Sequence, residues 1–207
     1  MNLKQAKNEI IKYANIVDSK GFSPGTSGNI SIRYKNKIII TASGTSNGDL
    51  SQDDLVIIDF DGKVVEGKKK ASSEKMLHVE FYKKRADINA IIHVHPTFLS
   101  SFAAARKSLE EPVMAENVYY FGKIPLADYA LPSSKKLVDN TAKYFDKCSA
   151  ILMANHGFIV GDVDLAQAYL KLELAESYAQ VVLNAKLLGG AVLLNEREVA
   201  EIEALKG

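Results

Sequence analysis

The sequence Ala90-Ile91-Ile92-His93-Val94-His95-Pro96 is a short apolar run interrupted only by two histidines. Apolar and β-branched residues that stop at a proline predict a buried strand over residues 90–94. Because alternate residues of a strand share a face, His93 and His95 should point the same way, while Ile92 and Val94 pack on the opposite side. Two imidazoles on one face of a rigid strand form half of a metal site, since imidazole is a common zinc ligand. We favour that interpretation over two core histidines bonded to backbone groups.

A third histidine occupies a comparable position in Ala154-Asn155-His156-Gly157, at the tip of another apolar run. Alone, His156 could be an ordinary turn residue. Together with His93 and His95 it completes a set of three imidazoles, and three protein ligands with one open position are typical of a catalytic zinc ion. The fourth histidine, His78, falls inside an amphipathic helical pattern, and we interpret it as a surface or packing residue.

Glu74 follows two serines in Ala71-Ser72-Ser73-Glu74, where a helix is expected to begin. It could complement the helix dipole from the first turn. It could equally lie near the metal and act as a base or a displaceable ligand. Spacing alone leaves both roles open.

Glycine, serine and threonine cluster at three places: residues 25–29, residues 43–46 and the pair Ser72 and Ser73. Such segments offer backbone N–H groups and hydroxyls that bind phosphate. None is a Walker or dinucleotide-binding fingerprint, and each alone is more often a simple turn. Three of them beside a candidate metal site favour an anion-binding site.

The composition is that of an ordinary globular protein, with 207 residues of which 47% are hydrophobic and 25% charged. A net charge of +1 gives no electrostatic footprint for nucleic acid or an anionic membrane. The one cysteine, Cys148, excludes an intrachain disulfide and is expected to pack before a strand. No signal-peptide pattern and no apolar run of membrane-spanning length is present, so we expect a cytoplasmic protein.

Hydrophobic periodicity predicts a single α/β domain over residues 1–207, with a mixed, mostly antiparallel central sheet covered by helices. Helices are expected over residues 3–19, 72–85 (with Ser72 as a possible cap), 98–105, 133–145, 162–188 and 196–205. Strands are expected over residues 30–34, 37–41, 55–60, 63–65, 90–94, 150–154 and 158–160. The segment 114–122 carries few indications of regular structure.

The order of these motifs along the chain resembles the class II aldolase/adducin family, over about residues 3–205. The segments that carry the resemblance are Gly25-Thr26-Ser27-Gly28-Asn29, Ser43-Gly44, Ser72-Ser73-Glu74, His93-Val94-His95 and Asn155-His156-Gly157. The resemblance implies a zinc-dependent aldolase that cleaves a ketose 1-phosphate to dihydroxyacetone phosphate and a small aldehyde, with L-fuculose 1-phosphate as the leading substrate.

The resemblance also assigns roles to residues. It implies one Zn²⁺ per subunit held by His93, His95 and His156, with Glu74 binding the metal at rest and moving protons in catalysis. The phosphate would be held by a set of polar loop residues: Asn29, Ser43, Gly44, Ser72 and Ser73, with Thr26, Ser27 and Gly28 shaping the first loop. It implies a homotetramer with active sites between subunits.

The chain departs from the family pattern in the segment 114–122. The family's aldolase places a tyrosine proton donor from a neighbouring subunit there, and the candidates here are Tyr119 and Tyr120, with Glu116 as a fallback. Epimerase relatives place an aspartate where this chain has Val118, which disfavours a sugar-phosphate epimerase. An epimerase or dehydratase on the same scaffold stays the alternative. A non-catalytic adducin-like assembly module is disfavoured, because it need not keep the three histidines and Glu74.

Overall fold

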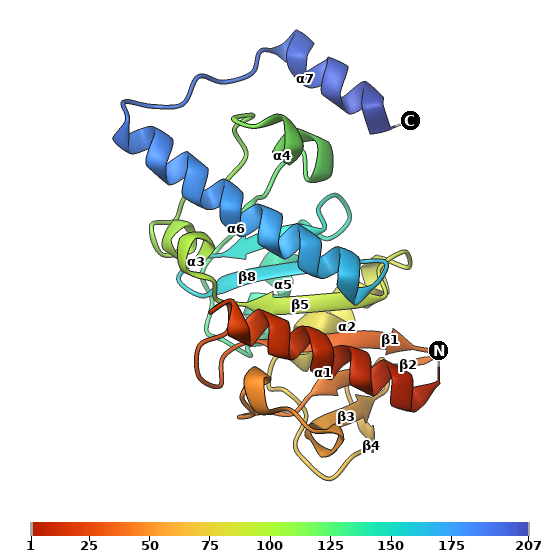
Figure 1. The fold of residues 1–207 in the computed structure, drawn as a ribbon. Helices are drawn as coiled ribbons and strands as arrows, with labels where there is room; N and C mark the ends of the chain where they lie inside the picture. The colour runs from red at the N-terminus through yellow and green to blue at the C-terminus, as the bar shows by residue number, and fades with distance from the viewer. Residues whose placement is uncertain (1, 207) are drawn as a thin grey trace.

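We analysed a computed structural model that describes residues 2–206, so the two ends of the predicted domain, 1 and 207, lie outside the described residues. Eight strands form one sheet in the order β4-β3-β2-β1-β5-β8-β7-β6 (Figure 1). Only β6 and β7 pair in parallel, and the other neighbours are antiparallel. The predicted α/β fold with a mostly antiparallel sheet is therefore confirmed.

The elements follow the predicted order. The strands are β1 (Asn29–Tyr34), β2 (Lys37–Thr41), β3 (Leu55–Ile58), β4 (Val64–Glu66), β5 (Ala90–Val94), β6 (Leu126–Ala127), β7 (Ala150–Met153) and β8 (Gly157–Asp162). The α-helices are α1 (Leu3–Ser19), α2 (Lys75–Lys84), α3 (Thr97–Ala104), α4 (Ala115–Tyr120), α5 (Lys135–Ala142), α6 (Leu165–Leu187) and α7 (Glu196–Glu203). Short 3₁₀ turns lie at Asn47–Asp49, Gln52–Asp54 and Ala204–Lys206. Among the described residues, no helix is both long and apolar enough to cross a membrane.

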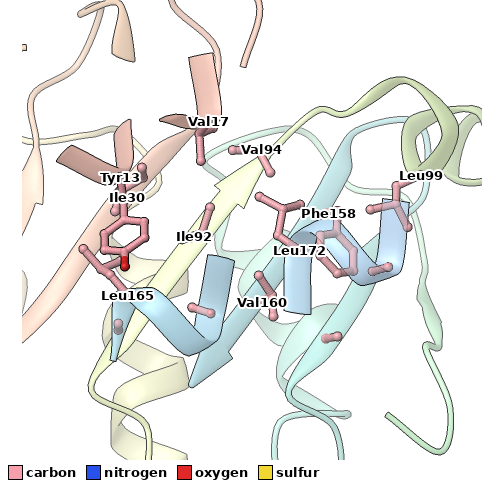
Figure 2. Packing of buried hydrophobic residues seen from close by; sticks show 14 of the residues in the cluster. Tyr13, Val17, Ile30, Ile92, Val94, Leu99, Phe158, Val160, Leu165 and Leu172 are labelled. Atoms are coloured by element: carbon pink, nitrogen blue, oxygen red, sulfur yellow. The ribbon is translucent and has the colours of Figure 1, made fainter. Parts of the chain in front are cut away.

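Helices cover both faces of the sheet. On one face, α1, α3 and α6 bury a cluster that includes Ile92 and Val94, as Figure 2 shows. On the other face, α2 and α5 pack on a second cluster that includes Ile91, with the half-buried Cys148 at its margin. Because Ile92 and Val94 face the first cluster, His93 between them faces the side covered by α2.

Three expectations about elements are wrong. The helix expected from Ser72 begins only at Lys75, because Glu74 occupies the cap position and the Ser72 hydroxyl instead accepts a hydrogen bond from the Glu74 N–H (3.2 Å) in the preceding turn. The segment expected to be irregular contains α4. The two-residue strand β6 was not expected, because two residues are too few for a periodic pattern.

Candidate metal centre and anion cleft

The three predicted metal ligands come together at one end of the sheet. In the register of the sheet, His93 on β5 pairs with Asn29 on β1 and with Ile159 on β8. His95 lies just past the end of β5, and its N–H donates to the Phe22 carbonyl (3.0 Å). His156 lies in the turn from β7 to β8. Strand alternation and one tight turn therefore aim all three rings at the same point.

The imidazole nitrogens lie close enough to share an ion. Ligand nitrogens of His93, His95 and His156 lie within 4.8 Å of one another, and the Nε2 atoms of His93 and His95 are 3.3 Å apart. Ligands about 2.0–2.1 Å from a tetrahedral zinc ion lie about 3.3–3.4 Å from each other. The donor set and its spacing thus fit a divalent metal ion.

The protonation of these rings also suits metal binding. His93 is fully buried, and its Nδ1–H donates to the Phe158 carbonyl (2.9 Å), which turns Nε2 toward the other two rings. Burial opposes the charged His93 ring, but the Glu74 carboxylate raises its pKa, so an ion would take the place of a proton on Nε2. Burial lowers the pKa of His95 to about 3 and that of His156 to about 4. Both rings are therefore neutral, and able to coordinate, throughout the physiological pH range.

Glu74 faces the same point from the start of α2. Its Oε2 lies 3.0 Å from His93 Nε2 and accepts a hydrogen bond from Asn29 Nδ2 (3.1 Å). Its buried Oε1 lies 3.3 Å from His156 Nε2 but has no hydrogen-bond partner. Burial opposes the charged carboxylate, yet His93, His156 and Asn29 outweigh burial and hold the pKa of Glu74 well below its usual value. An ionised buried carboxylate with one unsatisfied oxygen is suited to a metal ion or to a substrate proton.

A polar cleft of about 300 Å³ opens beside these residues. All eight loop residues predicted to bind phosphate line it, together with Glu74, His95 and His156: Thr26, Ser27, Gly28, Asn29, Ser43, Gly44, Ser72 and Ser73. The structure thus brings the predicted anion site and the predicted metal site into one cavity. Their hydroxyls and backbone N–H groups can hold an anion in the same cavity that His95, His156 and Glu74 line.

The first loop is held against the metal site by close packing. Gly28 has φ +78°, and a Cβ atom there would lie 2.7 Å from the His93 carbonyl oxygen. Only glycine tolerates both this conformation and this approach. Buried Asn47 donates to Ser23 Oγ (2.6 Å), and the Ser23 hydroxyl donates to the Ser27 carbonyl. These bonds fix the loop from beneath.

Sequence reasoning missed three features of the site. Pro132 and Ser133 line the cleft from the loop before α5, and Ser133 has φ +66°. The run Leu131-Pro132-Ser133-Ser134 could have marked this loop, but nothing in it points to the cleft. Of the two interpretations of His78, surface residue or packing residue, the first is wrong, because His78 is completely buried and bonds to Asn29.

The candidate proton donors are not at this cleft. Tyr119, Tyr120 and Glu116 belong to α4, and none of the three lines the cavity within one chain. Tyr120 is 52% exposed, and its ring packs edge-on against Tyr119 with centroids 4.9 Å apart. Within one chain, neither phenol is therefore placed to act at the cleft.

Comparison with known proteins agrees with this geometry. Residues 8–183 match the family described as Class II Aldolase and Adducin N-terminal domain. The chain belongs to this family. It is 33% identical to a 5-deoxy-D-ribulose 1-phosphate aldolase from Bacillus thuringiensis, covering 98% of this chain and 95% of the relative. It is 36% identical to an L-fuculose phosphate aldolase from Methanocaldococcus jannaschii, covering 86% of this chain and 95% of the relative.

A solved structure of an L-fuculose 1-phosphate aldolase superposes with a TM-score of 0.93 at 32% identity, covering 100% of this chain and 98% of that one. A 3-oxo-tetronate 4-phosphate decarboxylase from Haemophilus influenzae is 30% identical, with 89% of each chain covered. This chain is thus an enzyme of the class II aldolase family, whose relatives perform more than one reaction on sugar phosphates.

Proposed function

We propose that this protein is a zinc-dependent aldolase that cleaves a ketose 1-phosphate to dihydroxyacetone phosphate and a small aldehyde. The observation that carries the proposal is the meeting of three imidazoles and Glu74 with a hydroxyl-lined cleft of sugar-phosphate size. L-Fuculose 1-phosphate and 5-deoxy-D-ribulose 1-phosphate are the first substrates to test, because relatives at 36% and 33% identity carry those names.

The proposed roles follow from position. His93, His95 and His156 hold the ion, which supplies Lewis-acid stabilisation of the negative charge left when a bond beside a ketone breaks. The cleft residues anchor the phosphate: Thr26, Ser27, Gly28, Asn29, Ser43, Gly44, Ser72 and Ser73. Binding the phosphate remotely from the reacting carbons fixes the substrate's orientation. Glu74 takes and returns the proton, since its side chain lines the cavity and its buried Oε1 has no hydrogen-bond partner.

The same proposal includes the oligomeric state of the protein and its cellular compartment. A cytoplasmic homotetramer, built from chains that each act as one domain over residues 1–207, would place α4 of one subunit near the cleft of another. During cleavage, Glu74 would take the proton of the hydroxyl group that becomes the aldehyde, while the phenol of Tyr119 or Tyr120 donates a hydrogen bond to that oxygen. In the reverse reaction, the phenol would protonate the same oxygen. The exposed ring of Tyr120 supports this arrangement.

The test is a product assay with zinc-loaded protein over ketose 1-phosphates and 5-phosphates. We expect dihydroxyacetone phosphate from at least one 1-phosphate. His93→Ala should bind less than the one ion per chain that wild type carries, and its turnover should fall to background. Carbon dioxide from a 3-oxo acid phosphate would instead indicate a decarboxylase, and an isomeric 5-phosphate an epimerase. Either result without dihydroxyacetone phosphate would overturn the aldolase proposal.

A further inference from the structure

A chain of hydrogen bonds runs behind the metal site and uses a histidine that the proposed mechanism leaves out. Asn29 and Ser31 are two apart on β1 and face α2. Glu74, His78 and Tyr82 are four apart and lie on one side of α2 and its cap. The two rows meet side chain to side chain, so alternation on the strand and periodicity on the helix together build the chain.

The direction of every bond follows from Glu74. An ionised carboxylate only accepts, so the 3.1 Å contact is a donation from Asn29 Nδ2 and turns Asn29 Oδ1 toward His78. An amide oxygen also only accepts, so His78 Nε2, 2.5 Å away, must carry the ring's hydrogen. His78 Nδ1 is then bare and accepts from the Ser31 hydroxyl (2.7 Å). The Ser31 oxygen in turn accepts from the Tyr82 hydroxyl (2.8 Å).

Burial makes this arrangement unique. His78 and Ser31 are completely buried, Tyr82 is 1% exposed and Asn29 is 5% exposed, so water cannot replace a missing partner. Burial also lowers the pKa of His78 to about 3, which keeps the ring neutral with one hydrogen to place. Reversing the Asn29 amide would set its oxygen against the Glu74 carboxylate and its NH₂ group against a ring N–H. A buried mismatch of this kind is strongly unfavourable.

We propose that His78 is a positioning residue for the metal site: through its Nε2–H it fixes the Asn29 amide so that Nδ2 holds Glu74 Oε2 and leaves Oε1 beside His156 without a hydrogen bond. Among the described residues, the side-chain hydrogen bonds of His78 go to Asn29 and Ser31, and none goes to Glu74 or to the histidine cluster. The proposal rests on the proposed function only for the statement that Glu74 moves a proton. The hydrogen-bond chain itself can be tested without any activity.

The first experiment measures the His78 tautomer in ¹⁵N-labelled protein by long-range ¹H–¹⁵N correlation. The expected result is a neutral ring protonated at Nε2 with a bare Nδ1, and an Asn29 side-chain amide protected from exchange. A ring protonated at Nδ1 would overturn the proposal, because Asn29 would then have to present its NH₂ group to His78. A failed aldolase assay would leave this outcome unaffected.

The second experiment distinguishes the role of His78 Nε2 from that of His78 Nδ1. In His78→Gln the amide nitrogen can replace Nε2 and still donate to Asn29, whereas His78→Asn reaches only the Nδ1 position. We expect His78→Asn to lower kcat about 10–100-fold, in the range for groups that support a metal site, and His78→Gln to recover most of that loss. Equal losses that follow the loss of thermal stability would show that His78 only fills the core.

Two further variants exclude a packing effect. Tyr82→Phe removes a buried polar group one turn away on α2 without disturbing the Nε2 bond, so kcat should stay within about twofold of wild type. His78→Asn added to Asn29→Ala should cause no further loss of kcat, since His78 acts through Asn29. An additive loss in the double variant, or a Tyr82→Phe loss as large as that of His78→Asn, would overturn the proposal.

Discussion

Glu74 has different neighbours on its two oxygens, and this asymmetry separates two kinds of residue in the cleft. Its Oε2 is tied to Asn29 and faces His93, while its Oε1 is free of hydrogen bonds. Ser73 lines the same cleft with a hydroxyl group that carries no comparable charge. The carboxylate is thus suited to proton transfer, and the hydroxyl to holding a phosphate.

Substitutions at Glu74 and Ser73 should therefore affect different kinetic constants. Glu74→Gln keeps the shape but removes the proton acceptor, so kcat should fall by about 10²–10⁴ with little change in KM. Ser73→Ala should mainly raise KM, because one phosphate donor is lost. Steady-state kinetics of the two variants, at equal metal content, measures the changes in kcat and in KM separately. Full activity in Glu74→Gln would reduce Glu74 to a helix-cap residue.

A second carboxylate, which does not line the cleft, should contribute to stability against acid. Asp54 is 7% exposed, and hydrogen bonds from Lys69 and Ser51 lower its pKa to about 2. A depressed native pKa stabilises the fold above the unfolded pKa of about 3.9, and that stabilisation is lost as the pH falls toward about 2. Asp54→Asn should therefore unfold more easily than wild type at pH 7, by no more than about 2 kcal/mol.

Denaturant unfolding at a series of pH values checks this expectation. The difference between wild type and Asp54→Asn should shrink between about pH 4 and pH 2 and be largest at neutral pH. The matched control is Asp53→Asn, whose carboxylate is 75% exposed and lies 4.0 Å from Lys68. A pH-independent difference for Asp54 would place its contribution in packing and not in charge.

The meeting of His93, His95 and His156 could be predicted from the sequence, whereas the residues behind them could not. Strand alternation alone put His93 and His95 on one side, and the structure agrees. His78 sits in a helix whose pattern does not distinguish a buried polar position from a surface one. Its burial depends on Ser31 and Asn29, which lie on a strand more than 45 residues away. Such partners are fixed by tertiary packing, which local periodicity does not contain.

Helix α3 begins directly after His95, and its start is held by another helix. Glu176 on α6 accepts hydrogen bonds from the Phe98 and Leu99 N–H groups, each at 2.8 Å, and is 8% exposed. The cap residue, Pro96, supplies no side-chain hydrogen bond of its own. A carboxylate from α6 thus satisfies the unpaired donors at the start of α3 and complements its dipole.

Glu176→Ala should therefore destabilise the protein by about 1–3 kcal/mol, because two buried N–H groups lose their acceptor. The control is Glu173→Ala, one turn earlier on α6, whose side chain is 41% exposed and pairs with Lys20 at 2.9 Å. That surface pair should contribute less than about 1 kcal/mol. Urea unfolding of the two variants gives both values, and equal losses would contradict the capping role.

Element boundaries show where local patterns fail. Helix α1 matches its predicted bounds because Asn2 and Gln5 form a reciprocal cap at its start. The cap of helix α2 is Glu74, two residues later than the predicted cap Ser72, because Glu74 is held by Asn29 and the histidines instead of entering the helix. Helix α4 has only six residues, too few for a periodic pattern. Contacts at the site therefore shift the start of α2, and α4 is too short to be recognised from its sequence pattern.

At the scale of the whole molecule, helix α4 does not line the cleft of its own chain. It packs beside α6 and α7, as Figure 1 shows, and Lys206 Nζ donates to the Val118 carbonyl (3.1 Å). Tyr120 lines a surface hollow together with Leu170, which is 54% exposed. An exposed phenol beside exposed apolar residues is typical of a surface that meets another subunit.

If α4 supplies the phenol that acts on the aldehyde oxygen in a neighbouring cleft, one of Tyr119→Phe and Tyr120→Phe should lower kcat by about 10²–10⁴, the range for general acid–base catalysis. The variant should keep its metal content and its thermal stability, because a phenol oxygen on a surface helix contributes little to the core. Glu116→Gln tests the fallback donor in the same way. If none of these substitutions changes turnover, these side chains are structural.

Mixing two inactive variants then shows whether the phenol and Glu74 act from the same chain or from two chains. An inactive tyrosine variant combined with the inactive Glu74→Gln variant should regain activity after subunit exchange, because some mixed clefts would pair an intact Glu74 with an intact phenol from the neighbouring chain. Exchange itself is followed by mass spectrometry of differently labelled chains. Exchange without recovered activity would mean that the phenol and Glu74 act within one chain. That outcome would require α4 to move across the molecule, since within the described chain no residue of α4 lines the cleft.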